Sequence, residues 1–328
     1  MTEPWDCVIV GAGPAGLSAA LYMARFRRRV LVLHDGATRA ARIPKTFNAP
    51  GFPEGIAGPE LIERMTRHAR EFGATVQEAE VVSARKADGD GFELRSVAGE
   101  RFGAKALVLA TGLVLHQLPL DDDAHEAAIR AGVLRYCPIC DGYEHTGQRI
   151  GVIGCDSHGA AEALFVRQYS DDVTLVPREH AELTQPQREA LAQAGITVVG
   201  HAVRRYVPRD DGMEVHVQDR AEPLVFDVVY PAFGTRQRTE LAVSLGLDVD
   251  DAGAVDARAP YGTSVAGLYC AGDIVDGLDQ ISVAMGQGAI AATKAHNYLR
   301  QRDAQTLGSA VASDASQRDV AHAWRRTP

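Results

Sequence analysis

The chain has 328 residues, of which 46% are hydrophobic and 23% charged, enough for two globular domains of ordinary size. Its formal net charge of -9 argues against a broad nucleic-acid-binding surface, because such surfaces are basic. No apolar run reaches the roughly 18 residues that span a bilayer, and the acidic N-terminus lacks the features of a secretory signal. We therefore expect a cytoplasmic protein that binds neither nucleic acid nor membrane.

Residues 6–33 have the order of elements of a dinucleotide-binding unit. Apolar runs at 6–10 and 30–33 predict strands, and residues 17–24 have helical periodicity. The loop between them reads Gly11-Ala12-Gly13-Pro14-Ala15-Gly16. In such loops the first glycine allows a tight turn, the second lets the backbone approach a diphosphate, and the third lets helix and strand pack closely. Because free N–H groups at a helix start favour an anion, we expect a dinucleotide cofactor to bind at Gly11, Gly13, Pro14, Ala15 and Gly16.

Asp35 is the acidic residue expected to bind a ribose hydroxyl at the end of the second strand. The match is loose, because His34 precedes it and Gly36 follows it. A cofactor contact and a plain turn residue are both open interpretations of Asp35.

A second unit of the same kind begins near residue 149. An apolar run at 150–153 leads into a loop, residues 160–168 predict a helix, and residues 172–176 predict another strand. Two further strand ends, Ala110-Thr111-Gly112 and Ala271-Gly272-Asp273, lie on either side of this unit. The second unit is therefore expected to be inserted in the first.

The predicted fold class is α/β, with two Rossmann-like, three-layer dinucleotide-binding domains, the second inserted in the first. We expect the first domain to be discontinuous and the chain to end in a tail without apolar periodicity. The predicted ranges are 1–117 and 245–300 for the first domain, 118–244 for the second domain, and 301–328 for the tail.

Cys137-Pro138-Ile139-Cys140 places two thiols at the spacing of a redox-active pair. In such pairs the thiolate is favoured, and the thiolate is the species that exchanges with disulfides. A zinc half-site is the alternative, but no second cysteine pair or histidine pair occurs at ligand spacing, so we expect no metal. Cys7 and Cys270 lie in predicted buried strands and are expected to be core residues.

Together these motifs resemble those of the low-molecular-weight thioredoxin reductase family. The resemblance covers roughly residues 5–300. It is carried, in chain order, by Asn48-Ala49-Pro50-Gly51-Phe52-Pro53, Gly58-Pro59-Glu60-Leu61, Ala110-Thr111-Gly112, Cys137 to Gly142, Ala271-Gly272-Asp273 and Gln280-Ile281. It implies FAD in the discontinuous domain, a disulfide carried by the inserted domain, and a homodimer.

The same resemblance implies roles for individual residues. Besides the glycine loop and Asp35, it implies FAD contacts at Asn48, Ala110, Thr111, Gly112, Gly272, Asp273, Gln280 and Ile281. By resemblance, Cys140 faces the flavin, Cys137 exchanges with the substrate, and Asp141 is the general acid or base. His145 is a weaker candidate for proton transfer, and a surface histidine is the simpler interpretation of it.

The second nucleotide loop departs from the family pattern. It reads Gly154-Cys155-Asp156-Ser157-His158-Gly159, so an acidic side chain stands where backbone approaches the diphosphate. One such repulsion costs roughly 3–4 kcal/mol at an effective dielectric near 20. Of the basic residues that hold the 2′-phosphate of NADPH in the family, only Arg178 remains, beside Glu179. NADPH is therefore a doubtful cofactor, although an unusual mode of binding is an alternative.

We expect a FAD-dependent thiol–disulfide oxidoreductase that does not use NADPH as its main donor. Its expected partners are a thioredoxin-like protein or a small dithiol or disulfide substrate, with oxygen or ferredoxin at the other end of the electron path. In some members of the family an aromatic residue of a C-terminal extension covers the flavin, and Trp324 or His322 is the candidate here; a plain tail is the alternative. The alternative functions are an NADPH-dependent thioredoxin reductase with an atypical site and a flavin redox sensor.

Overall fold

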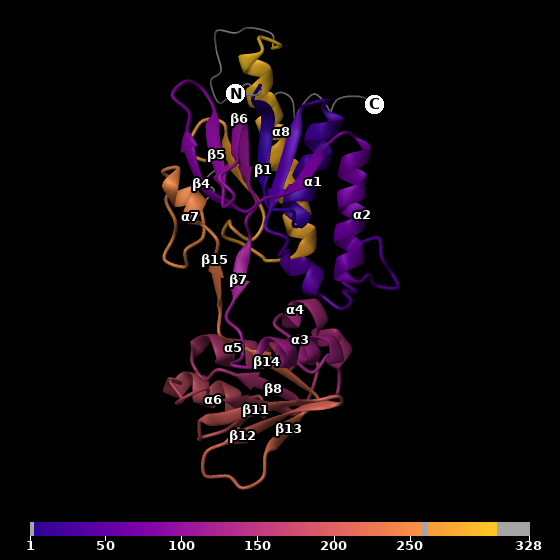
Figure 1. The fold of residues 1–328 in the computed structure, drawn as a ribbon. Coiled ribbons are helices and arrows are strands. Elements are labelled where there is room, and N and C mark those ends of the chain that lie inside the picture. The colour runs from indigo at the N-terminus through magenta and orange to yellow at the C-terminus, as the bar shows by residue number, and fades with distance from the viewer. Residues whose placement is uncertain (1–2, 257–261, 307–328) are drawn as a thin grey trace, which may run out of the picture.

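The computed structural model of the chain describes residues 3–256 and 262–306. Two domains lie one above the other in Figure 1, joined by two extended segments. The first domain is built from both ends of the described chain, and the second from its middle. This confirms the predicted α/β fold with one Rossmann-like domain inserted in the other.

The first domain is organised around a mostly parallel sheet with the strand order β3-β2-β1-β6-β5-β4. Strand β16 pairs in parallel with the last residues of β6, whereas β5 pairs antiparallel with the first residues of β6. Every residue of the central run at 7–10 is buried, as expected for a parallel strand covered on both faces. The strands are β1 (Trp5–Val10), β2 (Val30–His34), β3 (Thr75–Glu78), β4 (Val81–Lys86), β5 (Phe92–Ser96), β6 (Arg101–Leu109) and β16 (Leu268–Cys270).

Helices α1 and α8 pack against each other beside this sheet. Small residues allow the close approach: a side chain on Gly288 would lie 2.1 Å from the Ala15 carbonyl oxygen. Cys7 and Cys270 are fully buried in the sheet, which confirms them as core residues. The helices of this domain are α1 (Pro14–Arg25), the 3-10 helix η1 (Arg39–Arg42), α2 (Gly58–Glu71), α7 (Glu240–Ser244) and α8 (Ile281–Arg302).

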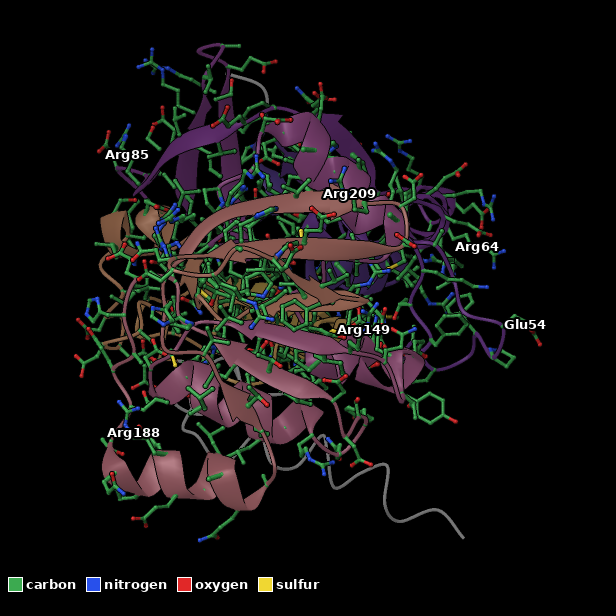
Figure 2. All side chains as sticks on the ribbon, turned by 90° about the horizontal axis from the view of Figure 1, so that it is seen from below. Glu54, Arg64, Arg85, Arg149, Arg188 and Arg209 are labelled. Carbon is green, nitrogen blue, oxygen red and sulfur yellow. A yellow bond between two sulfur atoms is a disulfide. The ribbon has the colours of Figure 1, made fainter. Side chains whose placement is uncertain are left out.

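The second domain has a parallel sheet of order β10-β9-β8-β14 and an antiparallel sheet of order β11-β12-β13. Its strands are β8 (Ile150–Ile153), β9 (Val173–Val176), β10 (Thr197–Val198), β11 (Val203–Arg209), β12 (Gly212–Val217), β13 (Leu224–Phe226) and β14 (Val228–Pro231). Its helices are α3 (Asp122–Ala131), α4 (Pro138–Asp141), η2 (Gly142–His145), α5 (Ser157–Val166) and α6 (Gln185–Gln193). Charged side chains such as Arg188 and Arg209 lie on its outside (Figure 2).

The two domains are connected by β7 (Leu113–Leu115) and β15 (Thr235–Gln237), which pair antiparallel. Helix α7 follows β15 and packs on β4 of the first domain. We therefore propose that the second domain ends near β15, a few residues before the predicted division between 244 and 245. Among the described helices, none combines the length and the apolar character needed to cross a lipid bilayer.

Candidate active site

The loop between β1 and α1 shows why its glycines are needed. A side chain on Gly11, which has a φ of 111°, would lie 2.1 Å from the Ala110 carbonyl oxygen. A side chain on Gly16 would lie 1.9 Å from the Gly11 oxygen, so both positions require glycine for backbone packing. A side chain on Gly13 would meet nothing within 4 Å. Gly13 therefore leaves open space at the start of α1, where the free N–H groups favour an anion.

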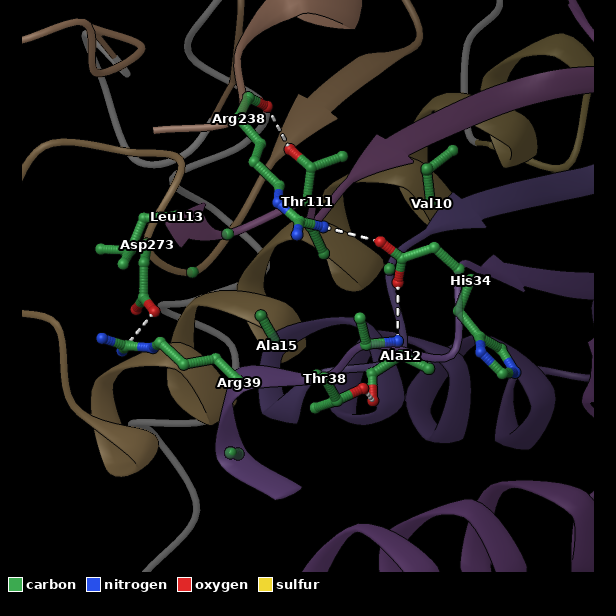
Figure 3. Close-up of a pocket in the computed structure, with 18 of the residues that line it drawn as sticks. Val10, Ala12, Ala15, His34, Thr38, Arg39, Thr111, Leu113, Arg238 and Asp273 are labelled. Carbon is green, nitrogen blue, oxygen red and sulfur yellow. Dashed lines mark hydrogen bonds and ion pairs between the residues drawn. The ribbon is translucent and has the colours of Figure 1, made fainter. Parts of the chain in front are cut away.

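A cavity of about 430 Å³ opens at this loop, within the size range of small-molecule sites. Figure 3 shows part of its lining. The sequence-predicted residues that line it are Gly11, Gly13, Pro14, Ala15, Asp35, Ala110, Thr111, Gly112, Gly272, Asp273, Gln280 and Ile281. Gly16 lies beneath the loop, in backbone contact with Gly11, and Asn48 lies beside the cysteine pair. Trp324 and His322 are outside the residues that the structure describes.

Two ion pairs between side chains that line the cavity were not expected from the sequence (Figure 3). Arg238 lies 2.7 Å from Asp35, and Arg39 lies 2.7 Å from Asp273. Burial alone would raise the pKa of Asp35, but hydrogen bonds from the Ala37 amide and from Arg238 lower it below its ordinary value. For Asp273 burial prevails over Arg39, and its pKa is raised. No sequence motif marks either arginine, because each pair joins residues about two hundred positions apart.

Cys137 and Cys140 form a disulfide at the start of α4. The amide nitrogen of Gln280 lies 3.5 Å from the Cys137 sulfur and 3.4 Å from the Cys140 sulfur. Gln280 also lines the cavity, and Asn48 holds its oxygen through a hydrogen bond of 2.9 Å. The disulfide is thus separated from the cavity by a single side chain, although it belongs to the other domain.

Asp141 follows the disulfide directly and is surrounded by polar groups of the second domain. The Tyr230 hydroxyl donates to its carboxylate at 2.8 Å, and the Arg135 guanidinium lies 3.3 Å away. Burial raises the pKa of Asp141, and the phenol and guanidinium oppose that effect only in part. A raised pKa makes the carboxylate of Asp141 more basic than that of an ordinary aspartate, which suits proton transfer. His145 is half-buried with its ring edge against Tyr230, and it bonds Gln148 at 2.7 Å.

The geometry thus joins a glycine loop, a cavity and a disulfide, and comparison with known proteins agrees with it. Residues 5–288 match the model of the pyridine nucleotide-disulphide oxidoreductase family. The chain belongs to this family. A thioredoxin reductase of Streptomyces coelicolor is 32% identical over 311 residues, covering 91% of this chain and 95% of that protein. One from Mycolicibacterium smegmatis is 33% identical, covering 91% and 97%.

Solved structures of relatives have the same arrangement. HlmI is 29% identical and superposes with a TM-score of 0.85, covering 98% of both chains. Thioredoxin reductase from Streptococcus pyogenes is 26% identical and has a TM-score of 0.83, covering 92% of this chain and 99% of that one. The chain is therefore a thioredoxin-reductase-like, flavin-dependent oxidoreductase. Membership of the family implies FAD, and the open space at Gly13 beside the start of α1 fits its diphosphate.

The second domain of this family member contains a loop built like the first one. Gly154 has a φ of 130°, and a side chain on Gly159 would lie 1.8 Å from the Gly154 oxygen. Asp156 occupies the place that Gly13 has in the first loop. Its carboxylate accepts a hydrogen bond of 2.8 Å from the Gly159 amide and caps α5. The turn is thus preserved, while the helix start is occupied by the protein's own anion.

Proposed function

We propose that this protein is a FAD-dependent thiol–disulfide oxidoreductase in which electrons pass between the Cys137–Cys140 pair and FAD. Bound FAD accepts or donates two electrons in this chemistry. The residues proposed to hold it are those that line the cavity, with Gly13 at the diphosphate and Asp35 and Asp273 as acceptors for hydroxyl groups. Gln280 supports this function most directly, because it touches both sulfurs and also lines the cavity.

We propose further that NADPH is not the main electron donor. Asp156 supports this proposal, because its carboxylate caps the start of α5. In dinucleotide sites the corresponding helix start holds the diphosphate. A bound diphosphate would have to displace that carboxylate or lie against it, at roughly 3–4 kcal/mol for one repulsion at an effective dielectric near 20.

Arg178, the one basic residue that remains of the 2′-phosphate site expected from the family, supports the same conclusion. The Arg178 guanidinium lies 5.2 Å from the centre of the Phe233 ring, within the range of a cation–π contact. Its neighbour Glu179 adds a negative charge. Recognition of a phosphate by arginine depends on free hydrogen-bond donors and on net positive charge. Glu179 reduces the net positive charge here.

The proposed substrate is a thioredoxin-like protein or a small dithiol or disulfide, and the proposed partner at the other end of the path is oxygen or ferredoxin. An NADPH-dependent thioredoxin reductase is the second candidate. It is favoured by the preserved turn at Gly154 and Gly159 and by the relatives, which are thioredoxin reductases. A homodimer and a cytoplasmic location are also proposed, and Trp324 as a cover over the flavin stays a prediction.

Anaerobic titration of the FAD-loaded protein tests the proposed donor. NADPH and NADH are added first and dithiothreitol second, while the absorbance of the flavin is followed. We expect the dithiol to bleach the flavin and stoichiometric NADPH to leave it oxidised. Bleaching by stoichiometric NADPH would contradict the proposal and establish the second candidate.

Asp156→Gly is the matched variant for this titration. It restores the glycine at the diphosphate position and costs only a few tenths of a kcal/mol as a helix cap. We expect it to bind NADPH more tightly than the unaltered protein by on the order of a hundredfold, because one close repulsion is removed. Equal affinity of both proteins would show that Asp156 does not control the site.

The electron partner is tested separately with dithiol-reduced protein. Hydrogen peroxide release in air would assign oxygen as the acceptor. Exchange of electrons with ferredoxin, without peroxide, would assign ferredoxin. Sedimentation of the FAD-loaded protein would test the proposed homodimer.

A further inference from the structure

One side chain of the first domain donates hydrogen bonds to both sulfurs of the disulfide. The amide nitrogen of Gln280 lies 3.5 Å from the Cys137 sulfur and 3.4 Å from the Cys140 sulfur. A primary amide has two N–H donors, which allows one for each sulfur. Among the described residues no other residue donates a hydrogen bond to either sulfur. Gln280 is also half-buried, so water competes with it only in part.

A chain of hydrogen bonds fixes the orientation of this amide. The Asn48 amide nitrogen donates to the Ile139 carbonyl at 3.4 Å and to the Gln280 oxygen at 2.9 Å. Because a backbone carbonyl can only accept, it decides which end of the Asn48 amide faces it. The Asn48 oxygen then accepts from the hydroxyl of Thr46, a buried residue, at 2.8 Å. With its oxygen held by Asn48, Gln280 turns its two N–H donors toward the sulfurs.

The opposite orientation of Gln280 would leave its groups without suitable partners. The Gln280 oxygen lies 3.8 Å from the Cys140 sulfur, but a disulfide sulfur has no proton to donate to it. If the amide were turned over, its nitrogen would face the Asn48 nitrogen, and two donors would oppose each other. The observed orientation satisfies both amides.

The charges beside the disulfide increase the importance of such a donor. Asp141 follows Cys140 directly, and its charged neighbours are Arg135, His145 and Glu144. Arg135 lies 3.3 Å from the Asp141 carboxylate, so its positive charge is largely used there. A carboxylate next to Cys140 disfavours a second negative charge on the sulfur. Neutral N–H donors that favour a negative sulfur therefore have a clear electrostatic effect at this place.

We propose that Gln280 stabilises the thiolate that forms when the Cys137–Cys140 disulfide opens, and that Asn48 and Thr46 position it for this role. The inference rests on the proposed thiol–disulfide function. When a substrate dithiol reduces the pair, the substrate is oxidised to a disulfide and the bond between the two cysteine sulfurs breaks. Two electrons stay on the cysteines, as one thiol and one thiolate. Of the two substrate protons, one stays on the thiol and the other is released to solvent.

The contribution of Gln280 arises mainly after the disulfide has opened. Hydrogen bonds to an ionised acceptor are roughly twice as strong as those between neutral groups. The contacts of Gln280 with the neutral disulfide therefore become stronger when one sulfur turns into a thiolate. Because the amide reaches both sulfurs, a donor is present at whichever cysteine carries the charge.

Single-cysteine variants allow a test without any turnover. Cys137→Ser leaves Cys140 as a thiol that cannot form the disulfide, and Cys140→Ser does the same for Cys137. The other cysteines of the described chain, Cys7, Cys155 and Cys270, are buried. Alkylation of the FAD-loaded variants by iodoacetamide is followed from pH 5.5 to pH 10. Since the thiolate is the nucleophile, the rate reports the fraction of thiolate.

Gln280→Met removes both donors and keeps the length of the side chain. In each single-cysteine protein we expect this change to slow alkylation roughly tenfold near neutral pH, because a hydrogen bond to a charged group is lost. The midpoint of the pH profile should move to higher pH, and the rates should converge where the thiol is fully ionised. Equal rates at all pH values would overturn the proposal. A ratio of rates that does not change with pH would also overturn it, because it would show a change of access alone.

Asn48→Leu tests the positioning of Gln280, because it removes the donor that holds the Gln280 oxygen. We expect the same pH-dependent decrease in rate at a smaller size, roughly threefold, since the amide is lost from its orientation and not from the site. A profile equal to that of the single-cysteine protein would overturn the role given to Asn48 and Thr46. Gln301→Met is the matched control: it makes the same change at an exposed position near the other end of α8, and its profile should match that of the single-cysteine protein.

Titration of the unaltered protein with dithiothreitol separates this inference from the proposed function. If the dithiol fails to bleach the flavin while the alkylation profiles shift as expected, the thiol–disulfide function is refuted and the thiolate donor stands. If the dithiol bleaches the flavin and the alkylation profiles coincide, the function stands and the thiolate donor is refuted.

Discussion

Glu162, on α5, has a carboxyl group whose Oε1 atom is buried and has no hydrogen-bond partner among the described residues. This buried carboxyl makes the stability of the protein depend on pH. Its pKa is about 7 in the folded chain against an ordinary value of 4.5. Between these values the folded state binds more protons than the unfolded state, so stability declines as the pH rises. The stability that the protonated Glu162 carboxyl contributes is fully present below pH 4.5 and is lost once the pH exceeds about 7. The loss amounts to about 3 kcal/mol at 1.36 kcal/mol per pKa unit.

Glu162→Gln removes this dependence, because an amide stays neutral. We expect the free energy of unfolding of the variant to exceed that of the unaltered protein at pH 8. This excess should be about 2 kcal/mol larger at pH 8 than at pH 5. Thermal unfolding of both FAD-loaded proteins at the two pH values measures this. The difference in Tm between them should grow by about 3 °C. Glu182 pairs with His180 in the same domain, but its side chain is exposed, so Glu182→Gln serves as the control and should follow the unaltered protein at both values.

Parallel melting curves for Glu162→Gln and the unaltered protein across this range would refute the reasoning. They would mean that Glu162 ionises in the folded protein as it does in the unfolded chain. In that case water would reach its buried oxygen, and the carboxyl would not retain a proton near neutral pH.

Three further predictions concern the two glycine loops and the cavity. Gly159→Ala should destabilise the second domain by about 3 kcal/mol or more in thermal unfolding, because its side chain would lie 1.8 Å from the Gly154 oxygen. Gly200→Ala is the control and should be tolerated, because its side chain would meet nothing within 4 Å. Gly13→Ala should unfold like the unaltered protein yet bind FAD at least roughly tenfold more weakly in a fluorescence titration; equal affinity would place the diphosphate elsewhere. Arg238→Gln should weaken FAD binding by roughly threefold to tenfold in the same titration, because its ion pair is partly exposed, and a loss of a thousandfold would show a direct role in binding.

Much of the candidate site could be predicted because its chemistry depends on residues close together in the sequence. The backbone turn that Gly11 and Gly16 permit is local, and so is the spacing of Cys137 and Cys140 in their disulfide. The substitution of Asp156 in the second loop was also visible from spacing alone. The role of Asp156 in the loop could not be predicted: its carboxylate caps the helix in place of an external anion.

The remaining parts of the site depend on contacts between distant segments. Tyr230 is an unremarkable aromatic residue in an apolar strand, yet it bonds Asp141, 89 positions away. Gln280 was predicted only as a FAD contact, and its place against Cys140, 140 positions away, depends on how the two domains meet.

The sequence by itself determined the two nucleotide-type loops, the redox pair and the departure in the second loop, because each is a short-range pattern whose spacing carries the chemistry. The tertiary structure alone decided which charges face each other and which are buried. Arg238 meets Asp35 and Glu162 loses its water only when strands and helices far apart in the chain are packed together. Desolvation and ion pairing act through space, and spacing along the chain does not encode them.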